Sequence, residues 1–308
     1  MRRPSLLGLL AGLTAAAIWG GMYVVSKVVM EVIPPFSLIT LRLLLGILVL
    51  AIFIVAKRDR KVTQKQFWQV LGVGFVGYGI SIGFQFVGTK MSTAANGALV
   101  TSATPAFVLL FAAILLSEKI TLRRLLALLV ATLGVVAVID PREAQLSSSL
   151  FWGNLSLVAA ALTWALYSVL IRMVTRSTDV LSTSLITFAG GLLVSIPLGA
   201  WEAARQGYGE ITLGVVGGIL FLGIISTALA MYLWNTAFAT LPAGVASLTF
   251  FAQPVVGAIL GAVFLGDPIT PLFILGGALI GTGLVIASTE SDQYSAFAAN
   301  SERPKRGL

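Results

Sequence analysis

A stripe of polar side chains crosses one of the apolar stretches of this sequence. Tyr78, Ser81, Gln85 and Thr89 recur at spacings of three and four residues, which places them on one face of a helix. Hydroxyl and amide groups stay uncharged at neutral pH, and they both donate and accept hydrogen bonds. Their chemistry is the recognition of a small polar solute, so we predict that Tyr78 and Gln85 line a cavity. The alternative is hydrogen bonding between helices, which contributes only about 0.6 kcal/mol per contact in membranes.

A second stripe of the same kind lies later in the chain. Thr227, Met231, Trp234 and Asn235 share one helix face. It corresponds to the first stripe, because a shift of 149 residues places Tyr78 on Thr227. We predict that Thr227, Trp234 and Asn235 belong to the same cavity.

Gln253 contributes another amide within an apolar run. It shares a helix face with Thr249 and Gly257, and the same shift places Thr104 on Gln253. We predict that Gln253 and Thr104 line the cavity. Gly257 and Gly261 form a small-xxx-small pair, for which we favour close packing of helices over a role in the cavity.

Trp19 and Trp164 occupy corresponding places near the start of each half of the chain. We predict that they form a wall or gate of the cavity, approaching it from opposite sides of the membrane midplane. Tyr23 follows Trp19 by one helical turn and is a candidate for the same gate. The alternative is that each tryptophan anchors its helix at the membrane surface.

Arg42 and two prolines could also shape the path. Arg42 is the only charged residue placed within a predicted span, and it lies about two turns from the outer end. Its side chain is expected to extend to the outer surface, as long cationic side chains do; the alternative is contact with a substrate carboxylate or a helix C-terminus. Pro105 and Pro254 each remove a backbone hydrogen bond, and we predict that they kink their helices around the cavity.

The composition shows what surrounds these residues. Of 308 residues, 57% are apolar and only 10% are charged, whereas soluble domains carry roughly 25% charged residues. Most of the protein must therefore face lipid. The absence of Cys and His excludes disulfides, thiol nucleophiles and Cys/His metal sites, so we expect no metal, no cofactor and no enzymatic activity. The net charge of +8 fits basic cytoplasmic loops, and we expect no nucleic-acid partner.

Hydropathy predicts an all-α integral membrane protein with ten transmembrane helices, because about 20 apolar residues cross the bilayer. The predicted spans are residues 6–26, 36–56, 67–89, 95–116, 123–139, 151–171, 181–201, 212–234, 244–265 and 270–289. Most Lys and Arg residues then lie on one side of the membrane. This bias predicts a multi-pass protein of the cell (inner) membrane with both termini in the cytoplasm.

The two halves of the chain also repeat each other. A shift of 149 residues places Pro105 on Pro254, and a shift of 145 places Trp19 on Trp164. We therefore predict a first five-helix repeat in residues 1–140, a second in residues 141–289 and a disordered cytoplasmic tail in residues 290–308. Five is an odd number, so the second repeat must be inverted in the membrane. Inverted repeats favour alternating access, in which a central site opens to one side and then to the other.

Several motifs together resemble one transporter family. They are Ala16-Ala17-Ile18-Trp19-Gly20, Thr40-Leu41-Arg42, the stretch from Pro105 to Thr121, and the segment from Tyr232 to Leu284 with its Leu-Pro-Ala-Gly and Gln-Pro-Val motifs. With these motifs in this order, the chain resembles the EamA branch of the drug/metabolite transporter superfamily over about residues 5–289. The resemblance implies two inverted five-helix units around a central cavity, and transport of amino acids, metabolites, sugars or drugs.

The predicted cavity is aromatic and neutral. It has no internal carboxylate, which argues against multivalent cationic drugs. It also lacks the several Arg or Lys residues that nucleotide sugars or sugar phosphates require. We therefore expect an exporter of neutral or zwitterionic solutes such as amino acids, whose partners are the solute and the lipid bilayer. We expect facilitated transport, or coupling through peripheral acids such as Glu31. The alternatives are a passive channel, a lipid scramblase, and, less favoured, a membrane-embedded enzyme.

Overall fold

Helices are the only regular elements in the described part of the chain. The computed structural model describes residues 6–56, 62–92, 100–101, 103–139, 150–265, 271–272 and 274–286. A helix pairs its backbone polar groups within one segment, as the hydrocarbon core of a bilayer requires. The prediction of an all-helical, multi-pass membrane protein is confirmed. The predicted tail of residues 290–308 lies outside the described residues.

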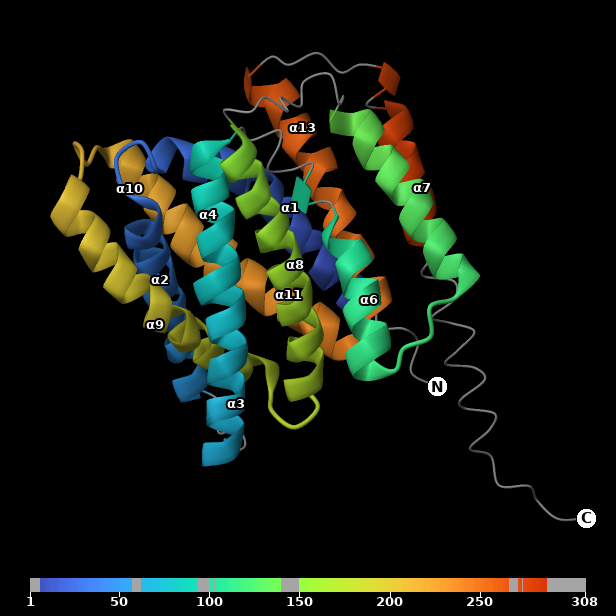
Figure 1. Cartoon of the computed structure of the whole chain (residues 1–308), viewed down its shortest axis with the longest axis horizontal. Coiled ribbons are helices and arrows are strands. Elements are labelled where there is room, and N and C mark those ends of the chain that lie inside the picture. Colours follow the sequence, from blue (N-terminus) through green and yellow to red (C-terminus); the bar gives the residue numbers. More distant parts are fainter. Residues whose placement is uncertain are drawn as a thin grey trace, which may run out of the picture.

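The helices form a bundle of roughly aligned rods (Figure 1). Six rods are long and apolar enough to cross a membrane. Three lie in the first half of the chain: α1 (Leu6–Val29), α2 (Pro35–Ala56), and one rod made of α3 (Gln64–Gly74), η1 (Phe75–Ser81) and α4 (Ile82–Met91). Three lie in the second half: α8 (Phe151–Val174), α9 (Val180–Gln206), and one rod made of α10 (Leu213–Leu220), η3 (Phe221–Leu229) and α11 (Ala230–Thr240). The others are α6 (Thr104–Leu116), α7 (Leu122–Ile139), the joined α12 (Ala243–Leu248), η4 (Thr249–Phe251) and α13 (Ala252–Leu265), and the unlabelled helix Ile274–Ile286. Within the described residues these rods agree in number with the ten predicted spans.

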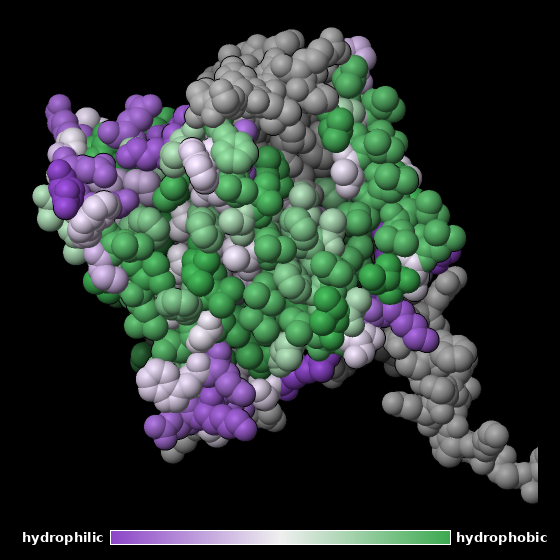
Figure 2. Space-filling view, viewed as in Figure 1, coloured by the Kyte–Doolittle hydropathy of each residue, from purple (hydrophilic) through white to green (hydrophobic). Residues whose placement is uncertain are grey.

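The outer surface of the bundle is apolar around its middle. Figure 2 shows a broad hydrophobic band, with hydrophilic side chains gathered near the start of α3 at one end and around α9 and α10 at the other. Large apolar side chains such as Leu48 of α2 and Leu129 of α7 are more than half exposed. Such a surface is unfavourable in water and matches the acyl chains of a bilayer.

Two helices are interrupted by π-helical turns that the sequence analysis did not predict. The segments η1 and η3 have π-helical geometry within otherwise α-helical rods. They carry Tyr78 and Ser81 on one rod and Ser226 and Thr227 on the other. A π-turn shifts the register of the side chains that follow it, and such turns are frequent at functional sites.

The two predicted proline kinks take a different form from the expected one. Pro105 lies in the first turn of α6, after a turn at Ala103, so it begins a helix instead of bending a continuous one over residues 95–116. Pro254 lies in the first turn of α13, directly after the 3₁₀ turn η4. Both positions suit proline because the first helical turn does not require its missing N–H. A third proline, Pro197, lies inside α9 and was not singled out from the sequence.

Two glutamates hold the N-termini of helices that come from other parts of the chain. Glu202 Oε2, in α9, accepts hydrogen bonds from the backbone N–H of Phe36 (2.8 Å) and Ser37 (3.1 Å) at the start of α2. Glu118 Oε1 accepts from the N–H of Ala243 (2.9 Å) at the start of α12. A carboxylate at a helix N-terminus satisfies free N–H groups and interacts favourably with the helix dipole. These contacts fix α9 against α2, and the end of α6 against α12.

Glu118 also pairs with two arginines from other helices, and we call these three residues the Glu118 cluster. Arg124 Nη1 lies 3.2 Å from Glu118 Oε2, and Arg172 Nε lies 3.3 Å from Glu118 Oε1. Arg172 also donates to the carbonyl oxygens of Phe238 and Leu241. The cluster therefore joins α6, α7 and α8 to the end of α11 and the start of α12.

Helices α3 and α9 pack closely because small residues face each other. A Cβ atom added at Gly74 would overlap the backbone of Thr187, and one added at Gly190 would overlap the backbone of Leu71. Gly257 likewise packs against Gly20 of α1, with 3.3 Å between its added Cβ and the Gly20 carbonyl oxygen, as the close-packing interpretation predicted. Glycine at these points lets two backbones approach without a side chain between them.

We predict that Gly74→Ala lowers the melting temperature of the purified protein in detergent. The added methyl group must push α3 away from the Thr187 backbone, an overpacking cost of roughly 1–3 kcal/mol. Gly72→Ala is the matched control, since no described atom lies within 4 Å of its added Cβ. Equal melting temperatures for the two variants would show that α3 and α9 do not meet at Gly74.

Candidate functional site

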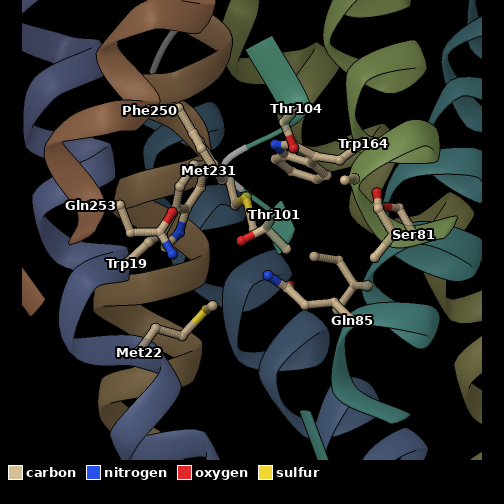
Figure 3. Close-up of a pocket in the computed structure, with 13 residues that line it drawn as sticks. Trp19, Met22, Ser81, Gln85, Thr101, Thr104, Trp164, Met231, Phe250 and Gln253 are labelled. Carbon is tan, nitrogen blue, oxygen red and sulfur yellow. The ribbon is translucent and has the colours of Figure 1, made fainter. Parts of the chain in front are cut away.

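A pocket lies at the centre of the bundle (Figure 3). Residues from both halves of the chain line it, among them Trp19 and Gln85 from the first half and Trp164 and Gln253 from the second. In Figure 3 the side chains of Trp164, Gln85 and Gln253 point toward a common space from different helices. The residues that line it are Trp19, Met22, Ser81, Ile82, Gln85, Thr101, Thr104, Ala160, Ala161, Trp164, Met231, Phe250 and Gln253.

Aromatic rings form one wall of the pocket. The ring centroids of Trp19 and Trp164 are 5.8 Å apart in an edge-to-face arrangement, and Trp19 also packs against Trp234 at 5.2 Å. The rings of Trp164 and Tyr167 stack at 4.6 Å behind this contact. Trp19 and Trp164 therefore meet inside the protein, and the alternative of two anchors at the membrane surface is wrong. Such a wall offers π-faces to an apolar or cationic group of a solute.

Four polar atoms at the pocket have no hydrogen-bond partner among the described residues. They are Gln253 Nε2, Gln253 Oε1, Thr104 Oγ1 and Trp164 Nε1. The three side chains are at most 7% exposed. Gln253 lies near the Tyr23 hydroxyl, but neither of its polar atoms reaches hydrogen-bond geometry. A buried polar atom without a partner is costly, about 1–3 kcal/mol each, and native proteins keep few of them. These donors and acceptors are available to a polar solute.

Tyr23 organises the polar side of the pocket from behind. Its hydroxyl lies 3.1 Å from Thr101 Oγ1 and accepts a hydrogen bond from Gln85 Nε2 at 2.8 Å. Gln85 and Thr101 line the pocket, whereas Tyr23 does not. Among the described residues, Tyr23 thus positions two lining side chains instead of facing the pocket as a gate.

A second hydrogen-bond chain lies next to the aromatic wall. The hydroxyls of Tyr78 and Tyr167 are 2.6 Å apart, and Tyr167 donates to Asn235 Oδ1 at 2.9 Å. Because Tyr167 uses its proton on Asn235, Tyr78 must donate to Tyr167. Asn235 Nδ2 donates to Ser184 Oγ at 2.9 Å. This chain ties η1, α8, α9 and α11 together.

The structure therefore divides the predicted cavity residues into two groups. Trp19, Gln85, Thr104, Trp164 and Gln253 line the pocket, whereas Tyr78, Thr227, Trp234 and Asn235 are buried in the described packing around it. Sequence reasoning missed Met22, Thr101 and Phe250 as lining residues. Met22 lies one turn from Trp19, so the helical spacing that selected Tyr23 could also have selected Met22.

The expectation that Arg42 extends to the outer surface is wrong. Arg42 is 1% exposed, and its Nε donates to Thr227 Oγ1 at 2.7 Å. Its guanidinium carbon lies 5.1 Å from the centroid of the Phe86 ring. Thr227 can accept this bond because its own proton goes to the Leu222 carbonyl oxygen (2.7 Å) in the π-helical segment. To reach the outer surface, the Arg42 side chain would need open space along α2, but η3 and α9 pack against that helix.

Known proteins resemble the chain along most of its length. It is 27% identical to the uncharacterized transporter YetK of Bacillus subtilis over 302 residues, which cover 96% of this chain and 92% of YetK. It is 28% identical to a probable amino-acid metabolite efflux pump of Salmonella typhimurium, over 89% of this chain and 92% of that protein. A chain of known crystal structure has the same fold, with a TM-score of 0.77 at 22% identity, over 93% of this chain and 98% of that one.

The sequence also matches one protein family twice. Residues 6–139 and residues 151–289 each match the EamA-like transporter family, so the two matches together cover most of the chain. The motifs from which the resemblance was inferred fall within these two segments. With its apolar helices and transporter relatives, the chain is a multi-pass membrane transporter and belongs to the EamA-like transporter family of the drug/metabolite transporter superfamily.

Proposed function

We propose that this protein carries small neutral or zwitterionic solutes, amino acids above all, through the central pocket by alternating access. The observation that carries the proposal is the set of polar atoms on Gln253, Thr104 and Trp164 that have no described partner beside an aromatic pocket wall. A solute with hydrogen-bonding groups at one end and an apolar group at the other fits this pocket. Its polar end would bond to the unpartnered atoms, and its apolar end would pack against the aromatic rings. The free energy of those hydrogen bonds would favour the bound solute over an empty pocket.

Amino acids match the pocket in chemistry. The faces of Trp19, Trp164 and Phe250 suit an apolar or aromatic side chain. Export as the direction is supported by the Salmonella relative, which is named a probable amino-acid metabolite efflux pump.

Two inverted five-helix repeats, residues 1–140 and 141–289, provide the mechanical basis of the proposed exchange. The two family matches support this division, since each segment contains five of the predicted spans and an odd number reverses the second copy. The π-helical segments add support, because a shift of 149 residues places η1 largely on η3. Inverted copies can exchange conformations and so open one pocket to either side.

The Glu118 cluster is the proposed closure on the cytoplasmic side. It joins helices of the first repeat (α6 and α7) to helices of the second (α8, α11 and α12) through charged contacts. By the charge bias of the loops, this end of the bundle faces the cytoplasm and both termini lie there, in the inner cell membrane. Separation of the two repeats at this end would open the pocket to the cytoplasm.

We predict that Gln253→Leu abolishes transport and leaves the fold intact. Leucine removes two buried polar atoms that have no described partner, so the melting temperature in detergent should stay the same or rise. Counterflow of labelled phenylalanine in proteoliposomes should fall at least about tenfold. This is the loss of affinity expected when one or two hydrogen bonds to the solute are removed. The matched control is Gln69→Leu, which changes an exposed glutamine of α3. Normal counterflow by Gln253→Leu would remove this amide from the site.

We predict that Glu118→Gln makes the pocket more accessible from the cytoplasmic side. The protein has no cysteine, so Met231→Cys introduces a single thiol into the pocket wall. Neutralising Glu118 weakens its ion pairs and should speed labelling of that thiol by a membrane-impermeant reagent in inside-out vesicles. Glu210→Gln, at an exposed position, is the control. Equal labelling rates would show that the cluster does not close this side.

We predict that fluorescent-protein fusions at both termini are fluorescent, because both ends lie in the cytoplasm. Alkaline phosphatase inserted at Gly207, between α9 and α10, should be active because that turn is predicted to lie outside. Fusions that place the two termini on different faces of the membrane would contradict the arrangement in two five-helix repeats.

A further inference from the structure

Arg42 is a buried cation that has no carboxylate partner among the described residues. It contacts the hydroxyls of Thr227 and Ser226, the sulfur of Met22 and the ring of Phe86, all of them uncharged. Glu202 of α9, a helix that packs against α2, is engaged by the backbone N–H groups at the start of α2. Within the described part of the chain, a full positive charge therefore lies inside the bundle without a paired countercharge. This is costly in a membrane, where buried charges normally pair or mark a substrate path.

The two ends of the guanidinium group are held very differently. On one side, Nε donates a short bond of 2.7 Å to Thr227 Oγ1. On the other, Nη2 reaches Ser226 Oγ only at 3.4 Å, and both Nη atoms lie 3.8 Å from the Met22 sulfur. A thioether is a weak acceptor, so the Nη donors are poorly satisfied. Two parallel N–H groups in this state are the geometry that binds a carboxylate through both of its oxygens.

Met22 separates this end of Arg42 from the pocket. Its side chain lines the pocket and also contacts both Nη atoms of Arg42. Figure 3 shows the Met22 thioether at the edge of the pocket, on the same side as Trp19. Methionine is unbranched and changes rotamer easily. A rotation of Met22 would let an anionic group of a bound solute reach the guanidinium.

We propose that Arg42 is the carboxylate-binding residue of the pocket and that the Met22 side chain covers it until a solute enters. This inference rests on the proposed transport function and narrows its substrates to solutes with a carboxylate. The ammonium group of an amino acid would face the Gln253 Oε1 atom and the tryptophan rings. The buried positive charge disfavours solutes that are only cationic.

The test compares an amino acid with its amide, which differs only at the carboxylate. In proteoliposomes, unlabelled phenylalanine and phenylalaninamide compete with counterflow of labelled phenylalanine. We expect the wild-type protein to bind the acid at least about tenfold more tightly than the amide, as a charge-assisted bidentate bond predicts. Arg42→Gln should lower the affinity for the acid by a similar factor, about tenfold, and should leave the affinity for the amide unchanged. Arg42→Lys should keep part of the preference.

Arg205→Gln is the matched control. Arg205 also lies over an aromatic ring, that of Trp201 at 5.6 Å, but it is exposed at the end of α9. Its loss should leave the ratio of the two affinities unchanged. The wild-type comparison needs no variant, so it stands even if Arg42→Gln does not fold.

The outcomes separate this inference from the proposed function. If the acid and the amide inhibit counterflow equally, the proposed role of Arg42 is overturned, but amino-acid transport stands. An unchanged preference for the acid in folded Arg42→Gln would overturn that role as well. No saturable counterflow of any amino acid would overturn the proposed function, and the inference with it.

Discussion

Polar groups inside a bilayer must find their partners within the protein, and this requirement governs the packing of these helices. Arg172 donates to carbonyl oxygens at the end of α11, and Glu118 and Glu202 accept from the first N–H groups of α12 and α2. Fully exposed contacts of this kind add little. These groups lie at helix ends and are partly or fully buried, so leaving one of them without a partner costs about 1–3 kcal/mol. These acids and bases thus help to fix which helices are neighbours.

The π-helical segments extend the same requirement to the centre of the molecule. In η3 the Thr227 hydroxyl donates to the Leu222 carbonyl oxygen, and the Ser226 carbonyl oxygen accepts from Trp19 Nε1 at 3.1 Å. Side chains thereby use carbonyl groups that the wider turn leaves available. One of these bonds positions a tryptophan of the pocket wall, and the other orients the acceptor of Arg42. The backbone geometry of η3 therefore helps to position both a ring of the pocket wall and the hydroxyl that accepts from Arg42.

The sequence predicted the spans and part of the site for physical reasons that also explain its failures. Hydropathy finds apolar segments of sufficient length, so the number of described rods agreed with the prediction. Helical periodicity found the buried face that carries Tyr78 and Gln85, but it cannot tell whether that face meets a cavity or another helix. Gln85 meets the pocket, and Tyr78 meets Tyr167. Arg42 was misplaced because its partners, Thr227 and Met22, are distant in the chain.

The contrast between the centre and the end of the bundle suggests how a solute could drive the proposed exchange. At the pocket, donors and acceptors of Gln253, Thr104 and Trp164 lack described partners, whereas Glu118 is paired with two arginines and a helix N-terminus. A ligand shifts a conformational equilibrium only by its difference in affinity for the two states. A solute that satisfies the central atoms best in an intermediate, closed state would offset the loss of the Glu118 contacts as the repeats separate. The empty pocket has no such compensation, so exchange would be favoured over leak.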